Sequence, residues 1–395
     1  MSEWKKVKFL DVISLNPRIS LEKGMEYPFV EMSNAVPGAR RPEKDVYQKY
    51  SGGGAKFEEG DTVVARIEPC LQNGKGFQCS YKKGFGSTEF LVFRPMNIKE
   101  MDYNFLYYYM GQQSIREAMA KTMVGASGRQ RVNNAVFNDL QIHLPPLSIQ
   151  QDIATILSRY DSLIENYQKQ IKLLEEAAQR LYKEWFVDLH FPGHENAKIV
   201  DGVPEGWEKK RIKDFVELQS GYAFKSSTFE EGCPYKIVTI KNVKDGVFEG
   251  ENVSTVRTVP EKMPNHCFLK DGDILLSLTG NVGRVCMVIG ENYLLNQRVA
   301  KLKTDYPAYT YSLFRSHEMF ITVSNLANGA AQQNVSPIRI GDIDIVMAND
   351  ELMKKFERVA GAYVDEIIKH HRQIRLLTEA RDRLLPKLMS GEIAV

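Results

Sequence analysis

The sequence predicts an α+β protein with a pseudo-twofold internal repeat, in which two small globular domains are separated by two long antiparallel coiled-coil helices. Three observations predict this fold. Similar segments recur at a constant offset, each copy contains an extended heptad pattern, and the rest mixes short β-type runs with glycine-rich turns. The expected parts are a first domain at 1–147, a central helix at 148–187, a linker at 188–206, a second domain at 207–349 and a C-terminal helix at 350–391.

The repeat is clearest around the helices. Asp139 aligns with Asp342 and Tyr160 with Tyr363, an offset of 203 residues that holds without a gap over about 55 residues. Between these anchors, "EEGDTVVARI" (58–67) resembles "LKDGDILLSL" (269–278) at an offset of 212. We therefore expect insertions and deletions in the variable parts of two related domains.

The first helix is expected to follow a strand that Pro145 and Pro146 terminate, because proline cannot continue a strand ladder. Ser148 with Gln151 predicts a capping box at its start. Its predicted heptad seam is Ile153, Ile156, Tyr160, Leu163, Tyr167, Ile171, Leu174, Ala178, Leu181 and Trp185.

The second helix lacks the double proline, and Asn349 or Asp350 is its expected N-cap. Two polar residues, His370 and Arg381, occupy positions in its seam. The apolar seam positions are Leu352, Phe356, Val359, Tyr363, Ile367, Ile374, Leu377, Leu384 and Leu388.

Each helix of about 38 residues would span roughly 57 Å. Two seams related by a twofold axis pack antiparallel, whereas a parallel intermolecular zipper is the alternative. The helices then either set a distance between the domains or serve only packing. DNA-binding modules on a dimer commonly lie about 34–36 Å apart, which such a pair of helices can accommodate.

Composition excludes several classes of protein. The 395 residues are 43% hydrophobic and 26% charged, which is typical of a soluble globular protein, and no apolar run reaches the ~18 residues that cross a bilayer. The N-terminal "MSEWKKVKFLDV" has no apolar region of a secretory signal. Five cysteines without CxxC spacing favour neither disulfides nor zinc, so a cytoplasmic location is expected.

Catalytic motifs are not found in the sequence. There is no HExxH, no GxSxG, no Asp/Asn-Pro-Pro-aromatic tetrapeptide and no nuclease-type cluster of acids and lysine, and "SGGGAKF" lacks the Lys-Ser/Thr ending of a P-loop. We expect no catalysis, no metal and no cofactor bound by this chain.

Candidate DNA contacts come from loops that combine glycine with Arg, Asn and Gln, because these side chains can read guanine or adenine with two hydrogen bonds. The net charge of +2 does not by itself indicate a nucleic-acid binder. Each loop alone is more often a plain solvated turn, and Tyr222 could be local core. The candidates are Arg40, Arg41, Ser127, Arg129, Gln130, Arg131, Asn133, Tyr222, Thr279, Asn281, Arg284, Gln332, Gln333 and Asn334.

The layout resembles the specificity subunit of Type I restriction-modification systems. The resemblance rests on "LQIHLPPLSIQQDIATIL", on "YKEWFVDLHFPG" followed by "GVPEGWEKKRIKDF", and on "LKDGDILLSLTGNVGRV" and "NGAAQQNVSPIRIGDIDI" in family order. Ala348-Asn349 in place of the double proline is a departure that alters a helix cap.

The resemblance implies a non-catalytic subunit whose two target recognition domains each read one half of a split, asymmetric target in double-stranded DNA. It implies two DNA adenine methyltransferase subunits as partners, which bind S-adenosylmethionine, and motor-nuclease restriction subunits. The alternative is a coiled-coil scaffold whose domains bind proteins.

Overall fold

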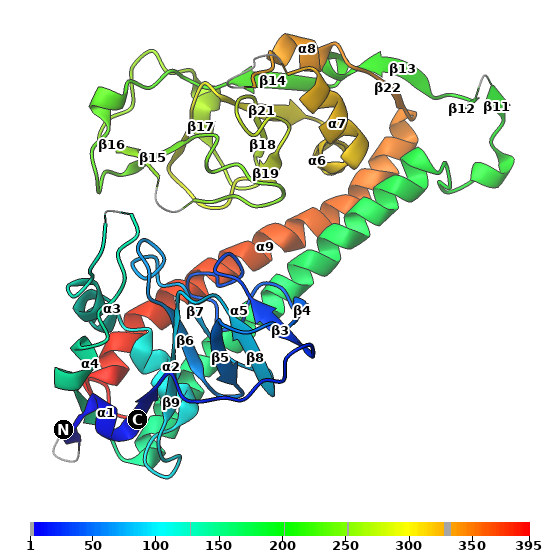
Figure 1. Cartoon of the computed structure of the whole chain (residues 1–395). Coiled ribbons are helices and arrows are strands. Elements are labelled where there is room, and N and C mark those ends of the chain that lie inside the picture. The colour runs from blue at the N-terminus through cyan, green and yellow to red at the C-terminus, as the bar shows by residue number, and fades with distance from the viewer. Residues whose placement is uncertain (1–3, 127, 201, 251–252, 328–332) are drawn as a thin grey trace. The chain divides into compact units, whose positions relative to one another are not determined.

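The computed structural model describes residues 4–126, 128–200, 202–250, 253–327 and 333–395 (Figure 1). The chain divides into two compact units, which are treated separately below. Unit 1 comprises Met1–Glu165 with Leu376–Val395, and unit 2 comprises Asn166–Arg375. Among the described helices, none is long and apolar enough to cross a membrane.

Unit 1 contains two four-stranded sheets, with strand orders β2-β9-β6-β7 and β4-β3-β8-β5, and a small β1-β10 pair. All neighbours are antiparallel except β3 and β8. The strands are β1 Lys5–Lys8, β2 Ile13–Leu15, β3 Glu26–Val30, β4 Tyr47–Lys49, β5 Ala55–Glu58, β6 Thr62–Ala65, β7 Gly76–Gln78, β8 Lys83–Gly86, β9 Phe90–Pro95 and β10 Gln141–Leu144.

Unit 2 repeats this topology strand for strand, with orders β14-β21-β18-β19 and β16-β15-β20-β17 and a β13-β22 pair. Its one parallel pair among the described strands, β15 with β20, also corresponds to β3 with β8. The internal repeat is thereby confirmed. The strands are β13 Glu208–Arg211, β14 Val216–Ser220, β15 Tyr235–Val238, β16 Thr255–Val256, β17 Phe268–Leu269, β18 Ile274–Ser277, β19 Val285–Met287, β20 Tyr293–Leu295, β21 Val299–Thr304 and β22 Asp344–Met347. A short antiparallel pair is formed by β11 Ile199–Val200 and β12 Val203–Pro204.

The turn before the central strand of each unit explains why both copies of the repeat have the residues Gly-Asp at this point. Gly60 and Gly272 precede β6 and β18 with φ of +90° and +83°, a conformation that favours glycine. A Cβ at Gly60 would also lie 2.7 Å from the Tyr103 ring. The four residues of β6 and of β18 are all buried, as expected for strands covered on both faces.

Each domain contains two consecutive short helices separated by a break, at residues 103–120 in unit 1 and 307–325 in unit 2. Ser316 ends α6 in extended conformation and caps α7 by accepting the Met319 N–H, so one residue forces the break. Asp102 caps α2 in the same way. The short helices are α1 Phe9–Val12, α2 Tyr103–Met110, α3 Gln113–Ala120, α4 Val136–Asp139, α6 Pro307–Arg315, α7 His317–Asn325 and α8 Pro337–Gly341.

The long helices are α5, Leu147–Tyr182, extended by a π-helical turn at Lys183–Val187, and α9, Asp350–Met389. Within unit 1, Asp161 of α5 pairs with Arg381 of α9. Within unit 2, the Trp185 ring lies 5.8 Å from that of Phe356. Later residues of α5 thus meet earlier residues of α9, which confirms the antiparallel prediction over the parallel zipper.

The predicted capping box of α5 is wrong, whereas the N-cap of α9 is confirmed. α5 begins at Leu147, directly after Pro146, so Ser148 lies inside the first turn. The buried Gln150 instead ties the junction, donating to Pro145 O at 2.9 Å and accepting from Asp102 N at 2.9 Å. In α9, Asn349 Oδ1 accepts the Leu352 N–H at 3.0 Å.

The predicted seam is partly wrong in the first half of α5. Leu163 is 46% exposed, whereas Leu157, Asp161 and Ile164 are buried. Asp161 is buried because it faces Arg381, and a pattern of apolar residues does not indicate such a pairing. In α9, Val359 was predicted in the seam but is exposed. Arg381 is buried, so its predicted position in the seam is confirmed.

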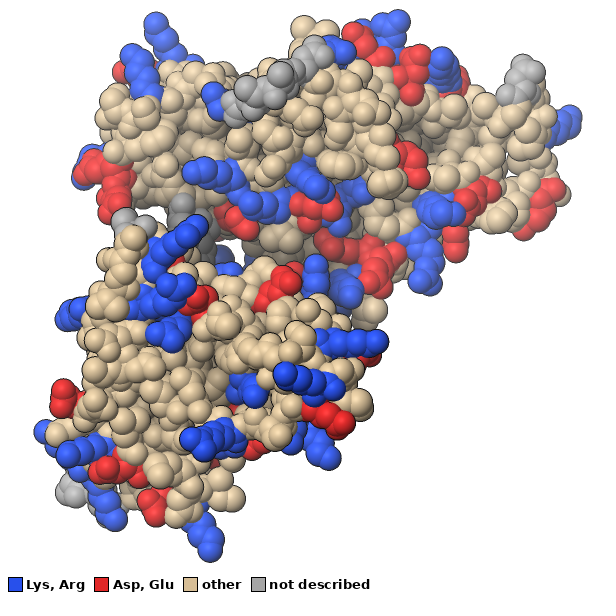
Figure 2. Space-filling model, in the orientation of Figure 1, with Lys and Arg blue, Asp and Glu red and all other residues tan. Residues whose placement is uncertain are grey.

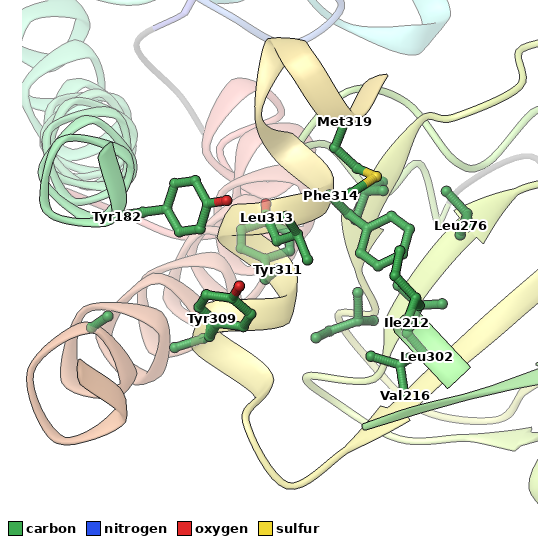
Figure 3. Close-up of a cluster of buried hydrophobic side chains, with 14 of the residues drawn as sticks. Tyr182, Ile212, Val216, Leu276, Leu302, Tyr309, Tyr311, Leu313, Phe314 and Met319 are labelled. Carbon is green, nitrogen blue, oxygen red and sulfur yellow. The ribbon is translucent and has the colours of Figure 1, made fainter. Parts of the chain in front are cut away.

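The core of unit 2 shows how helix and sheet are joined (Figure 3). Tyr309 and Phe314 of α6 belong to a buried cluster that also holds Tyr182 of α5 and Val216 and Leu302 of the sheet. The ring of Tyr182 lies 5.7 Å from that of Tyr309. The long helix is therefore part of the hydrophobic core of the domain, and the sheet is anchored to it.

Candidate nucleic-acid interface

Two loops of unit 1 are tied side by side by main-chain hydrogen bonds. The loop after β6 and the loop after α3 are joined by Glu68 N donating to Gln130 O at 3.0 Å and Val132 N donating to Arg66 O at 2.9 Å. An isolated antiparallel bridge, Ile67 with Arg131, lies between these bonds. The paired loops of unit 1, residues 66–75 and 124–134, therefore present their side chains from a defined backbone.

Unit 2 makes the same tie at equivalent positions. Gly280 N donates to Gln333 O and Val335 N donates to Leu278 O, both at 2.9 Å. The bridge between them is Thr279 with Asn334. The paired loops of unit 2 are residues 278–284 and the described residues 333–335. The loops of the two units correspond to each other, because donors and acceptors agree residue by residue at the offsets of 203 and 212.

Equivalent positions carry different side chains. Arg131 of unit 1 makes a bidentate ion pair with Glu89, with N–O distances of 2.7–3.0 Å. These hydrogen bonds lower the pKa of the Glu89 carboxyl against an opposing effect of burial. In unit 2, Asn334 takes the place of Arg131, and its Oδ1 accepts the Thr279 hydroxyl at 2.7 Å. The same frame thus presents a charged pair in one unit and a neutral pair in the other.

The other predicted contacts on the paired loops differ in exposure. Arg129, Asn133, Asn281 and Gln333 are exposed and Gln130 is half-buried. Asn133 Oδ1 accepts the Ala135 N–H at 3.0 Å, which leaves its amide N–H groups for other partners. Ser127 and Gln332 were also predicted, and they lie outside the described residues.

Arg284 and Tyr222 are bound to neighbours in unit 2. The Arg284 guanidinium lies 4.5 Å from the centre of the Phe320 ring and 3.6 Å from Asp245. Tyr222 is partly buried, with its ring 5.1 Å from that of Phe224. The alternative reading of Tyr222 as local core agrees with this packing.

Arg40 and Arg41 are engaged inside unit 1. Arg40 donates twice to Gln78 Oε1, at 2.9 and 2.6 Å, and also to Asn104 Oδ1. Arg41 donates to the main-chain oxygen of Gln78 at 3.3 Å. These internal acceptors occupy several of the N–H groups that base reading would need.

Catalytic chemistry gets no support from the described residues. No group of three or more His, Cys, Asp and Glu side chains there could hold a metal ion. All five cysteines are free thiols, and burial raises the pKa of the Cys79 thiol to about 12, which keeps it protonated. Figure 2 shows acidic side chains interspersed among the basic ones on the visible face of each unit.

Sequence reasoning missed Glu89 and Arg66, which position the paired loops of unit 1. Arg66 Nη2 donates to Val132 O at 3.2 Å, across the tie. Arg66 directly follows β6 in the structure, but nothing in the sequence distinguishes it from an ordinary surface arginine.

The chain carries two related surfaces that have the same backbone frame but different polar side chains. This is the arrangement of a recognition subunit with two different recognition domains. The family model of the Type I restriction modification DNA specificity domain matches residues 1–176 and 204–346. The chain belongs to this family. Specificity subunits are the non-catalytic, DNA-recognising component of these systems and act with methyltransferase and restriction subunits.

Individual relatives agree with this assignment. The chain is 30% identical to the Type I restriction enzyme MjaVIII specificity subunit of Methanocaldococcus jannaschii, over 80% of this chain and 75% of that one. It is 22% identical to the HindI specificity subunit of Haemophilus influenzae over the full length of both. The fold resembles the crystal structure of a Type I S subunit from M. genitalium, with a TM-score of 0.59, 17% identity, and coverage of 98% and 96% of the two chains. The alternative interpretation, a coiled-coil scaffold whose domains bind proteins, is not supported by these comparisons.

Proposed function

We propose that the two units read the two unlike halves of a split, asymmetric target in double-stranded DNA, each through its paired loops. The observation that carries this proposal is that the main-chain hydrogen bonds joining the paired loops are the same in both units, while the side chains on those loops differ. A constant backbone frame positions the reading groups, while Gln130 and Arg131 in one unit and Gln333 and Asn334 in the other give different hydrogen-bonding patterns.

The two long helices would set the number of base pairs between the half-sites. Each long helix is continuous, and each contributes residues to both units. Because the buried core of each unit includes residues of both long helices, a change in helix length would be transmitted to the domains.

The partners that complete this function would be two adenine methyltransferase subunits, each carrying S-adenosylmethionine, docked on the helical part, together with restriction subunits in the cytoplasm. The internal repeat supports two copies of the methyltransferase, since two equivalent surfaces can bind two equivalent partners. The boundaries 1–147, 148–187, 188–206, 207–349 and 350–391 are retained as the proposed functional parts.

Among the predicted contacts, Arg129, Gln130, Asn133, Asn281 and Gln333 are the first choice for base reading, because they are wholly or partly accessible on the paired loops. Arg131, Thr279, Arg284 and Asn334 would support them, since their side chains pair within the protein. Ser127, Gln332, Tyr222, Arg40 and Arg41 remain candidates of lower rank.

A matched pair of substitutions tests the assignment of half-sites. Gln130→Ala is expected to weaken discrimination at one or two positions of one half-site, by roughly 5- to 150-fold per lost contact of about 1–3 kcal/mol. Gln333→Ala, at the equivalent position, should do the same in the other half-site only. Binding of the complex with its methyltransferase to duplexes carrying single base changes measures both effects. Equal losses at both halves in either variant would contradict the proposal.

A further inference from the structure

Unit 1 has an open hollow of about 750 Å³ beside its paired loops. Three of the residues that line it are cations, Arg18, Lys56 and Arg66, and none of the described lining residues is acidic. Arg66 belongs to both features, because its main-chain oxygen is part of the tie while its side chain lines the hollow. An anion bound in the hollow would therefore lie next to the reading loop.

Arg66 is short of hydrogen-bond partners. Its Nη2 donates to Val132 O, but its buried Nε atom makes no hydrogen bond within the described part of the chain. A buried guanidinium N–H without a partner is costly, which makes it a ready donor to an incoming oxygen. Glu89 is close enough for the Arg66 charge to contribute to lowering its carboxyl pKa, but the Glu89 oxygens already accept the hydrogen bonds of Arg131.

We propose that this hollow binds a backbone phosphate of the DNA duplex and thereby orients the paired loops of unit 1 over their half-site. The proposal rests on the proposed DNA-reading function. Cations contact the phosphodiester oxygens, and the apolar part of the wall, with Ile19 and Leu21, suits the neighbouring deoxyribose. Such a contact fixes register and orientation and carries no base information.

The site belongs to one unit. The strand registers and the loop tie place Phe268 and Leu278 of unit 2 at the positions of Lys56 and Arg66. The offset of 203 residues aligns Gly221 with Arg18. The three cations are therefore replaced by uncharged residues. The two half-sites would differ in their phosphate contacts as well as in their bases.

The test is a charge-matched comparison in the complex of the full chain with its methyltransferase. Arg18→Gln with Lys56→Gln removes two charges from the hollow, and Lys8→Gln with Lys99→Gln removes two from exposed sites elsewhere in unit 1. Arg66 is left intact because its side chain also holds Val132. Affinity for the target duplex is measured between 50 and 200 mM salt.

The hollow variant should reduce the steepness of log affinity against log salt by about 0.9, since loss of one phosphate contact removes about that much. Its affinity for the target and for a duplex with a scrambled first half-site should fall by the same factor. A slope equal to that of the unmodified complex, or an equal drop in the control variant, would overturn the phosphate site.

Two further outcomes separate the causes of failure. If the unmodified complex shows no sequence preference, the proposed function itself fails. If inorganic phosphate stabilises the chain against heat relative to chloride at equal ionic strength, and the hollow variant abolishes this effect without changing the DNA slope, the hollow binds a small free anion and the duplex proposal is overturned.

Discussion

Replacing Arg381 by alanine is expected to destabilise unit 1 by roughly 3–5 kcal/mol, because it leaves the carboxylate of Asp161 buried without its ion-pair partner. The two side chains are 10% and 3% exposed, with 2.7 Å between Arg381 Nη1 and Asp161 Oδ1. Burial acts to lower the pKa of Arg381, but the charge and hydrogen bond of Asp161 raise it overall. Arg381 also donates to Gly38 O at 2.9 Å. The lost pair should lower the melting temperature of unit 1 by about 6–20 °C, as measured by calorimetry.

The control for this prediction removes both charges. The equivalent positions of unit 2 are occupied by Val364 and Ala178, so the fold tolerates an uncharged pair there. Asp161→Val combined with Arg381→Met should recover most of the lost stability, because replacing a buried ion pair by apolar side chains of similar volume is often neutral. If the double variant were as unstable as Arg381→Ala alone, the cost would come from packing and the account of the buried charge would be wrong.

Lengthening the helices is expected to lengthen the gap between the half-sites. Gln170 and Gln373 occupy equivalent positions of α5 and α9, an offset of 203 residues. Four residues inserted after each would add about 6 Å to each helix, at 1.5 Å per residue. With about 3.4 Å per base pair, the spacer should grow by one to two base pairs while the bases of both half-sites remain the same. Mapping of methylated sites in cells that express the variant measures the gap.

Two companion variants make this result decisive. Seven residues inserted at the same places preserve the heptad register and should add about 10 Å, or three base pairs. Four residues inserted after Glu195, in the proposed linker, should leave the gap unchanged. Retained methylation with an unchanged gap in both helix variants would show that the helices do not set the spacing.

The architecture could be predicted because it depends on periodicity. The offset of 203 and the heptads are regular patterns in the sequence, and the structure has the internal repeat and the antiparallel helices that they predict. The errors came where a polar residue takes a tertiary role. Asp161 is buried because Arg381, 220 residues away along the chain, faces it, and no local pattern indicates that pairing. Gln150 replaced the predicted capping box for the same reason.

The candidate site could be predicted as a set of loops but less well as a set of residues. Glycine-rich composition led to residues 124–134 and 278–284, and the structure shows that each is tied to a second loop. Composition could not distinguish Arg131, which pairs with Glu89, from Arg129, which is exposed. It also could not bring Arg18, Lys56 and Arg66 together, because they come from three separate segments of unit 1.

The central claim is that this one chain determines a two-part DNA target through two different reading domains. The most direct test is sequencing of methylated bases across the host genome, with the gene intact and deleted. Deletion should abolish methylation at one split motif with two unlike halves separated by a constant number of unspecified base pairs. Loss of a palindromic or contiguous motif, or an unchanged methylation pattern, would contradict the claim.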